Sequence, residues 1–83
     1  MFEVLLKPKA EKELDNLDNK LKIKIVKRLV DLKDSPYPAD SKKLKDTNYY
    51  RIRIGDYRVI YEVNKNDKII FVSRIVHRKD AYK

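Results

Sequence analysis

Residues 49–63 read YYRIRIGDYRVIYEV, the most regularly patterned stretch of the chain. Apolar and polar residues alternate on both sides of Gly55-Asp56, which is a two-residue turn signal with glycine first, of the type II′ kind. The pattern predicts a β-hairpin, and a four-residue loop at the same place would keep the same pairs. The predicted pairs are Ile54 with Tyr57, Arg53 with Arg58, Ile52 with Val59, and Arg51 with Ile60.

The two faces of this hairpin differ in character. One face is apolar and is expected to meet helices; it comprises Tyr50, Ile52, Ile54, Tyr57, Val59, Tyr61 and Val63. The other comprises Tyr49, Arg51, Arg53, Arg58, Ile60 and Glu62. Arg53 and Arg58 are expected directly opposite each other, with Cβ atoms about 4.5–5.5 Å apart, and like charges so placed destabilise a hairpin. Selection for folding alone would tend to avoid this pair, so the arrangement favours a functional role.

The choice of arginine over lysine supports the same interpretation. Five of the six arginines lie between residues 51 and 78, and residues 49–83 hold nine Lys and Arg against four Asp and Glu. A guanidinium is a planar fork that grips phosphate in a bidentate manner. The pattern therefore favours a site for nucleic-acid phosphates over a surface that is basic only for solubility.

The remaining segments complete an α+β domain. Residues 2–6 are a short strand candidate, a helix begins near Pro8 and ends within residues 15–19, and a second helix covers about residues 19–33. Residues 68–76 form a last strand, which is expected to be central because both of its alternating rows are apolar. The order β-α-α-β-β-β predicts one domain over residues 1–83, with two N-terminal helices packed on one face of an antiparallel sheet.

The second helix has an unusually wide apolar arc. One stripe comprises Leu21, Ile25, Leu29 and Leu32, and a second beside it comprises Ile23, Val26 and Val30. Together they span roughly 200°, so one stripe can face the sheet while the other meets the first helix or an incoming partner. The opposite arc is a basic ridge that includes Lys24, Lys27 and Arg28, for which solvation is the commoner explanation.

Length and composition exclude several classes of function. The 83 residues carry a net charge of +8 and leave room for one domain. One His, one Gly and no Cys exclude multi-His metal patterns, Gly-rich phosphate loops and disulfides. The longest apolar stretches are far shorter than the roughly 20 residues of a membrane span, and no signal peptide is recognisable. We expect a cytoplasmic protein that needs no cofactor or metal and makes no membrane contact.

Residues 50–63 and 75–82 together resemble the RelE branch of the RelE/ParE toxin superfamily, and the resemblance extends over the whole chain. It implies a RelE-like fold, similar to that of microbial RNases, and a toxin of a type II toxin–antitoxin pair. Such a toxin cuts mRNA in the ribosomal A site and thereby inhibits translation. The implied partners are mRNA, the ribosome and an acidic RelB-like antitoxin, with a heterotetramer as one form of the toxin–antitoxin complex.

The resemblance also implies roles for single residues. The expected catalytic residues are Arg53, Arg58, Arg78 and Tyr82. Of the expected RNA-binding residues, Arg51 follows from the resemblance, whereas charge and position add His77, Lys79, Lys24, Lys27 and Arg28. The expected chemistry is attack of a 2′-hydroxyl on the adjacent phosphate, with the arginines stabilising the charge of the phosphorane. The resemblance leaves the identity of the general base open. His77 is the only side chain whose ordinary pKa suits proton transfer near neutrality.

Two other functions stay open at this point. A ParE-like inhibitor of DNA gyrase would share the fold, and the co-occurrence of Arg58, Arg78 and Tyr82 favours the RelE branch over it. The other is a non-catalytic RNA-binding module, and the sheet shows no exposed aromatic pair of the kind that stacks bases in such modules.

Overall fold

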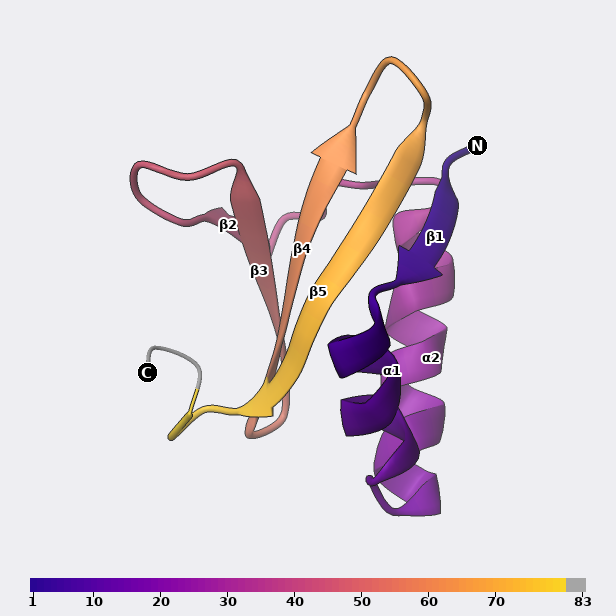
Figure 1. Cartoon of the computed structure of the whole chain (residues 1–83), viewed down its shortest axis with the longest axis vertical. Coiled ribbons are helices and arrows are strands. Elements are labelled where there is room, and N and C mark those ends of the chain that lie inside the picture. The colour runs from indigo at the N-terminus through magenta and orange to yellow at the C-terminus, as the bar shows by residue number, and fades with distance from the viewer. Residues whose placement is uncertain (81–83) are drawn as a thin grey trace.

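The computed structural model describes residues 1–80, which form two helices and one five-stranded sheet (Figure 1). The elements are β1 (Glu3–Leu6), α1 (Pro8–Asp15), α2 (Asn19–Leu32), β2 (Lys42–Lys43), β3 (Tyr49–Ile54), β4 (Tyr57–Asn64) and β5 (Ile69–His77). The strands lie side by side in the order β1-β5-β4-β3-β2. The α+β class and the predicted order of helices and long strands are confirmed, with the two-residue strand β2 as an addition.

The β3–β4 hairpin has the predicted register. Arg53 pairs with Arg58 and Ile52 pairs with Val59, as the turn signal requires. Of the two turn residues, only Gly55 has a positive φ, at 58°, as in a type II′ turn. Glycine adopts this left-handed conformation without the steric cost that a side chain would add. The local sequence therefore sets which side chains share each face of the hairpin.

The sheet is mixed, which corrects the expectation of a purely antiparallel sheet. β1 pairs with β5 in parallel, from Glu3 opposite Ile69 to Leu6 opposite Val72, whereas the other pairs are antiparallel. Parallel neighbours need a long crossover connection, and here both helices and the β3–β4 hairpin lie between the two strands in sequence. β5 consequently lies between β1 and β4, in the interior position that its apolar composition predicts.

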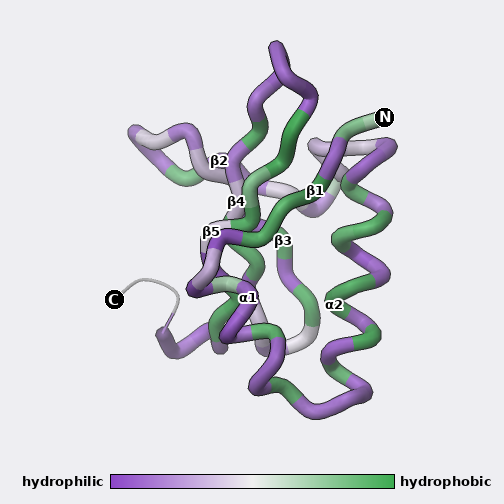
Figure 2. Tube along the Cα trace, turned by 45° about the vertical axis from the view of Figure 1, so that its right-hand side comes forward, coloured by the Kyte–Doolittle hydropathy of each residue, from purple (hydrophilic) through white to green (hydrophobic). Residues whose placement is uncertain are grey.

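Both helices cover the same face of the sheet, as predicted, and the core lies between the two layers (Figures 1 and 2). Its fully or nearly fully buried members are Ala10 of α1, Ile25, Leu29 and Leu32 of α2, and Ile52, Ile54, Val59, Tyr61, Ile70, Val72 and Ile75 of the sheet. The side chains predicted to form the apolar face of the hairpin thus pack against the helices. Within residues 1–80, neither helix is long and apolar enough to cross a bilayer.

Tyr61 gives the core a measurable pH dependence. Its ring is fully buried, its hydroxyl donates a hydrogen bond to the Pro36 carbonyl at 2.8 Å, and burial raises its pKa from 10.0 to about 12. The unfolded chain loses this proton near pH 10, whereas the folded chain holds it until about pH 12. The folded state therefore binds more protons in this window, and the free energy of unfolding should fall by roughly 2 to 3 kcal/mol as the pH rises through it.

The variant Tyr61→Phe tests this expectation. It should lower the free energy of unfolding by about 1 to 2 kcal/mol at neutral pH, because the Pro36 carbonyl loses its donor. The loss of stability between pH 10 and 12 should shrink by the Tyr61 contribution. Urea unfolding of both proteins across this range measures the difference; equal slopes against pH would contradict the assignment to Tyr61.

Candidate nucleic-acid interface

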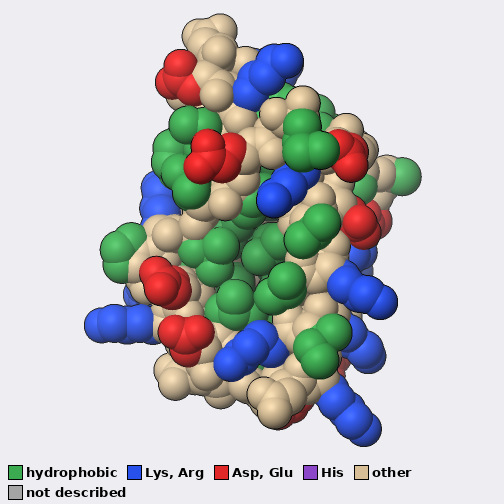
Figure 3. Space-filling view, turned by 90° about the vertical axis from the view of Figure 1, so that its right-hand side faces the viewer, with side chains coloured by type: hydrophobic (Ala, Val, Ile, Leu, Met, Phe, Trp, Pro, Cys, Tyr) green, Lys and Arg blue, Asp and Glu red, His purple; other side chains and the backbone are tan. Residues whose placement is uncertain are grey.

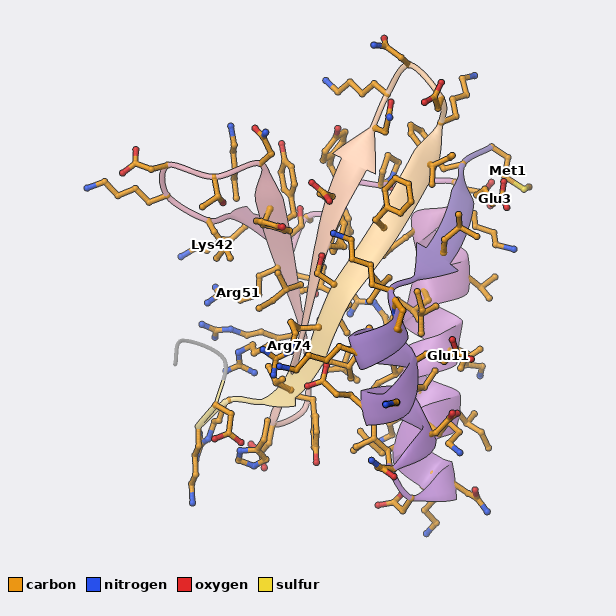
Figure 4. The ribbon with its side chains drawn as sticks, in the orientation of Figure 1. Met1, Glu3, Glu11, Lys42, Arg51 and Arg74 are labelled. Carbon is orange, nitrogen blue, oxygen red and sulfur yellow. The ribbon has the colours of Figure 1, made fainter. Side chains whose placement is uncertain are left out.

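The face of the sheet that points away from the helices carries arginines from three strands. We call it the arginine face, and its members are Arg51 and Arg53 of β3, Arg58 of β4 and Arg74 of β5. Arg53 lies opposite Arg58, and Ile60 separates Arg51 from Arg74 in the next row of the sheet. Figure 4 shows Arg51 on the side of the sheet opposite the helices. Lys42 of β2 pairs with Arg51 and extends the row; β2 has only two residues, so no alternating pattern in the sequence could have predicted this neighbour.

Backbone carbonyls at the hairpin turn orient Arg58. Its Nη1 donates to the Tyr57 carbonyl at 3.1 Å and to the Gly55 carbonyl at 3.4 Å. Arg53, its cross-strand partner, is exposed. The structure therefore confirms the like-charge pair that the predicted register required.

Arg78 reaches the same end of the sheet. Its backbone N–H donates to the Asp56 carbonyl at 2.7 Å, and its Nε lies 3.9 Å from Asp56 Oδ1. These contacts hold the segment after β5 against the β3–β4 turn, so Arg78 lies near Arg53 and Arg58. Its side chain is 60% exposed, which keeps the guanidinium accessible to a ligand.

Arg74 is held by a part-buried ion pair with a carboxylate of α1. Its Nε and Nη2 donate to the Glu13 carboxylate at 2.9 to 3.2 Å, and this hydrogen bonding raises the pKa of Arg74. Glu13 Oε1 also accepts the backbone N–H of Ile75 at 3.0 Å, on the part of β5 beyond its pairing with β1. Arg74 therefore joins α1 to the sheet, and the candidate phosphate-binding groups are Arg51, Arg53, Arg58 and Arg78.

His77 lies on the other face of the sheet. Its ring meets the Tyr57 ring edge to face, with centroids 5.4 Å apart, and its Nδ1 accepts the backbone N–H of Lys79 at 3.3 Å. Tyr57 packs against the core, so His77 shares the helix side and not the arginine side. Lys79 is exposed directly beyond the strand. Tyr82, the remaining predicted catalytic residue, lies outside the described residues.

The basic ridge of α2 belongs to a different surface. Lys24 and Lys27 are exposed on the helix layer, which the sheet separates from the arginine face. Arg28 is paired with Asp40, whose carboxylate oxygens lie 2.8 and 2.9 Å from its Nη2. The structure thus does not bring these three predicted RNA-binding residues together with the arginines of the sheet.

The same helix leaves its second apolar stripe uncovered. Ile23, Val26 and Val30 are 61%, 42% and 51% exposed, whereas the first stripe packs on the sheet. Figure 3 looks at the helix side of the molecule and shows hydrophobic side chains gathered in a hollow with charged side chains around it. An exposed apolar stripe of this kind is typical of a surface that binds another protein.

The chemistry available at the hairpin end of the arginine face is electrostatic. Guanidinium groups donate hydrogen bonds and spread positive charge, but they do not accept protons at ordinary pH. Within residues 1–80, no three His, Asp or Glu side chains gather in a group that could hold a metal ion. The described side chains of this site can therefore bind and neutralise phosphate.

Comparisons with known proteins agree with this geometry. The family described as "ParE toxin of type II toxin-antitoxin system, parDE" matches residues 4–82. RelE1 of Methanocaldococcus jannaschii is 38% identical over 87 residues, which cover 99% of this chain and 96% of the relative. The chain belongs to the RelE/ParE superfamily of toxins, as the resemblance in its sequence indicated. Within that superfamily it is a RelE-type toxin of a toxin–antitoxin system.

Solved structures support the same assignment. The toxin chain in the archaeal RelE–RelB complex from Pyrococcus horikoshii superimposes with a TM-score of 0.85 at 32% identity, over 96% of this chain and 98% of that one. The corresponding chain in the RelB–RelE antitoxin–toxin complex from Methanococcus jannaschii gives a TM-score of 0.77, also at 32% identity, with 94% of each chain covered. The predicted RelE-like fold is therefore confirmed.

Proposed function

We propose that this toxin is a ribosome-dependent endoribonuclease that cuts mRNA in the A site without a metal ion. The observation that carries the proposal is that Arg53, Arg58 and Arg78 all lie at the hairpin end of the sheet. Guanidinium groups gathered at one end of the sheet suit a phosphate that gains negative charge during the reaction.

The proposed reaction is an internal transfer. The 2′-hydroxyl oxygen forms a bond to the adjacent phosphorus and gives up its proton, and the bond from phosphorus to the 5′-oxygen breaks. The 5′-oxygen takes up a proton, so the products are a 2′,3′-cyclic phosphate and a 5′-hydroxyl. Arg53, Arg58 and Arg78 stabilise the phosphorane, and Arg51 positions the RNA backbone.

Two further residues complete the proposed site. Tyr82 stacks on a base or assists proton transfer, and Lys79 adds a phosphate contact. His77 is a weaker candidate for proton transfer than its sequence position suggested, because its ring packs on Tyr57 on the opposite side of the sheet. The arginines supply charge and not proton transfer, which fits a reaction whose RNA geometry is set by the ribosome.

The deciding experiment incubates the protein with mRNA in the presence and absence of ribosomes, and maps the ends of the products. We expect cuts within the A-site codon with ribosomes only, leaving cyclic-phosphate and 5′-hydroxyl ends. A gyrase supercoiling assay is run in parallel, because the matching family is described by its ParE members. Intact mRNA together with inhibited gyrase would favour the ParE-like function, and RNA binding without cutting would favour a non-catalytic module.

The proposal includes an acidic, RelB-like antitoxin that silences the toxin in the cytoplasm. The structural relatives from Pyrococcus and Methanococcus are toxins bound to RelB. In this chain, the exposed stripe of α2 lies beside Lys24 and Lys27, and such a surface fits an amphipathic helix with acidic flanks. A heterotetramer of two toxins and two antitoxins is the assembly that we expect sedimentation of the co-expressed pair to reveal.

The pair of Arg53 and Arg58 predicts a conflict between stability and activity. Arg53→Thr removes one of two like charges at directly paired positions and introduces a residue that favours strands, so the free energy of unfolding should rise by about 0.2 to 1 kcal/mol. The same change should slow mRNA cutting at least tenfold, because one phosphate ligand is lost. Urea unfolding and cutting rates on the same preparation measure both effects, and a destabilised variant would show that the pair is not repulsive.

A further inference from the structure

A cleft opens at the end of the sheet away from the hairpin turn. The pairing of β3 with β4 ends at Tyr49 and Glu62, while β4 continues to Asn64 and stays paired with β5. The two arms separate beyond that point, as Figure 1 shows between β3 and the β4–β5 hairpin. Side chains from both arms line a cleft of about 640 Å³, which is within the range of small-molecule sites.

One wall of the cleft is aromatic. The rings of Tyr37 and Tyr50 have centroids 5.0 Å apart, and Tyr50 stacks on the buried Tyr61 at 5.9 Å. The core therefore fixes Tyr50, and Tyr37 rests on it while 38% of its surface stays exposed. Lys65 Nζ lies 5.5 Å from the centre of the Tyr37 ring, so an ammonium group now occupies a ring face.

The rest of the lining is polar and carries net positive charge. Asn48 and Asn66 contribute exposed amides, and Lys43 and Lys65 contribute exposed ammonium groups. The one acidic residue of the lining, Glu62, is paired with Lys7 at 3.1 Å. Aromatic faces, amides and cations together suit an unpaired nucleotide: its base stacks on a ring, its edge bonds to amides, and its phosphate meets a lysine.

The position of the cleft connects it to the arginine face. Arg58, Ile60 and Glu62 follow one another on the arginine side of β4, so the Glu62 edge of the cleft begins about 13 Å from Arg58 along the strand, whereas Tyr50 and the Tyr37 ring beside it lie on the side that meets the helices. A single strand of RNA that places one phosphate at Arg58 would reach the Glu62 edge within a few nucleotides, and the next base would have to enter between the two arms to reach the Tyr37 ring. Lys65 would then leave the Tyr37 ring for a phosphate, and a base would take its place.

We propose that this cleft is a second nucleotide subsite, which binds one unstacked base and its phosphate at a distance from the phosphate held by Arg53, Arg58 and Arg78. The proposal rests on the proposed ribonuclease function for the identity of its ligand. Its source is either the mRNA beyond the cut codon or an exposed nucleotide of ribosomal RNA, which present the same chemistry.

Binding of 2′-O-methyl RNA, which cannot be cut, tests the subsite independently of cleavage. Fluorescence anisotropy compares a labelled trinucleotide with a nonanucleotide of the same base composition. We expect the nonanucleotide to bind wild type at least tenfold more tightly, and Tyr37→Ala to remove about tenfold of that affinity. Lys65→Ala, an exposed change that does not threaten the fold, should weaken binding and lower the salt slope by about one.

Lys12→Ala is the matched control, because it removes one exposed lysine from α1, away from the cleft. If Lys12→Ala and Lys65→Ala lose equal amounts of RNA affinity, the effect of Lys65 is explained by overall charge, and the proposal is overturned. Equal affinities of the wild-type protein for the trinucleotide and the nonanucleotide would also overturn the proposal. So would a Tyr37→Ala variant that keeps its affinity for RNA and loses its affinity for the antitoxin. A wild-type protein that fails to cut mRNA can still bind the nonanucleotide more tightly than the trinucleotide, with Tyr37→Ala losing that difference. In that case the ribonuclease proposal fails and the subsite proposal stands.

Cross-linking in the ribosome complex separates the two sources. With 4-thiouridine placed in the mRNA on either side of the A-site codon, a cross-link to the peptide that contains Tyr37 identifies the mRNA as the ligand. In a parallel preparation, 4-thiouridine is incorporated into the ribosomal RNA instead; a cross-link of that peptide to ribosomal RNA then identifies the other source and equally supports a nucleotide subsite. No cross-link to either RNA from this peptide, in a complex that cuts normally, would overturn the proposal.

Discussion

Replacing Arg58 with Ala should slow ribosome-dependent mRNA cutting by about 100- to 1,000-fold, the usual cost of removing one group that stabilises transition-state charge. Arg58 lies between the exposed Arg53 and the segment that carries Arg78, so its guanidinium is central to the cluster. Two of its hydrogen bonds run to the Gly55 and Tyr57 carbonyls at the hairpin turn, and the one to Gly55 is exposed, so water can replace it. The variant should therefore fold normally, and the rate of product formation on programmed ribosomes measures the loss.

Two controls separate the role of Arg58 from a general loss of charge. Arg58→Lys keeps the charge but not the planar fork, so it should recover only part of the rate. Lys12→Ala removes an exposed cation from α1 and should cut at the wild-type rate. Undiminished cutting by Arg58→Ala, with unchanged circular dichroism, would contradict the assignment of this residue to the reaction.

The sequence predicted the arginine cluster because the hairpin is a local structure. Gly55 takes the left-handed conformation, and from there alternation alone places Arg51, Arg53 and Arg58 on one side. No distant contact is needed to derive that register. The same holds for the helix layer, since the apolar period of α2 by itself indicates which residues face the sheet.

The facing of β5 could not be predicted, because a bulge changes its phase. Ile60 pairs with Arg74 but Tyr61 pairs with Val72, so Ser73 is an extra residue without a partner on β4. Before the bulge the even-numbered residues of β5 face the helices, and beyond it the odd-numbered residues do. Both alternating rows of this strand therefore need apolar residues to fill the core. The same shift turns His77 to the helix side, away from the arginines.

Contacts between distant segments account for the other differences. Glu13 neutralises Arg74 across 61 residues, and Asp40 neutralises Arg28 from the loop after α2. Neither pair has a periodic signal, so counting charges along the chain overstated the free positive charge on both surfaces. The parallel pairing of β1 with β5 likewise depends on how the helices cross the sheet, which no local pattern encodes.

Placing two lysines on the uncovered stripe of α2, as Val26→Lys with Val30→Lys, should weaken antitoxin binding by at least about 30-fold. Both side chains are roughly half exposed and lie one helical turn apart, next to Ile23. In a toxin–antitoxin interface they would be buried among apolar groups, where truncating or charging a central contact commonly costs 2 kcal/mol or more. In the free toxin they face water, so the free energy of unfolding should change by less than about 0.5 kcal/mol.

The controls for this double variant use the separation of the two surfaces. Because α2 and the arginine face lie on opposite sides of the sheet, mRNA cutting by the free toxin should be unchanged, while silencing by added antitoxin should need a higher antitoxin concentration. Lys24→Ala, a charge change on the same helix, should mainly alter the association rate and its salt dependence. Titration calorimetry with the antitoxin measures all three proteins. An unchanged affinity in the double variant would mean that the antitoxin binds elsewhere on the toxin.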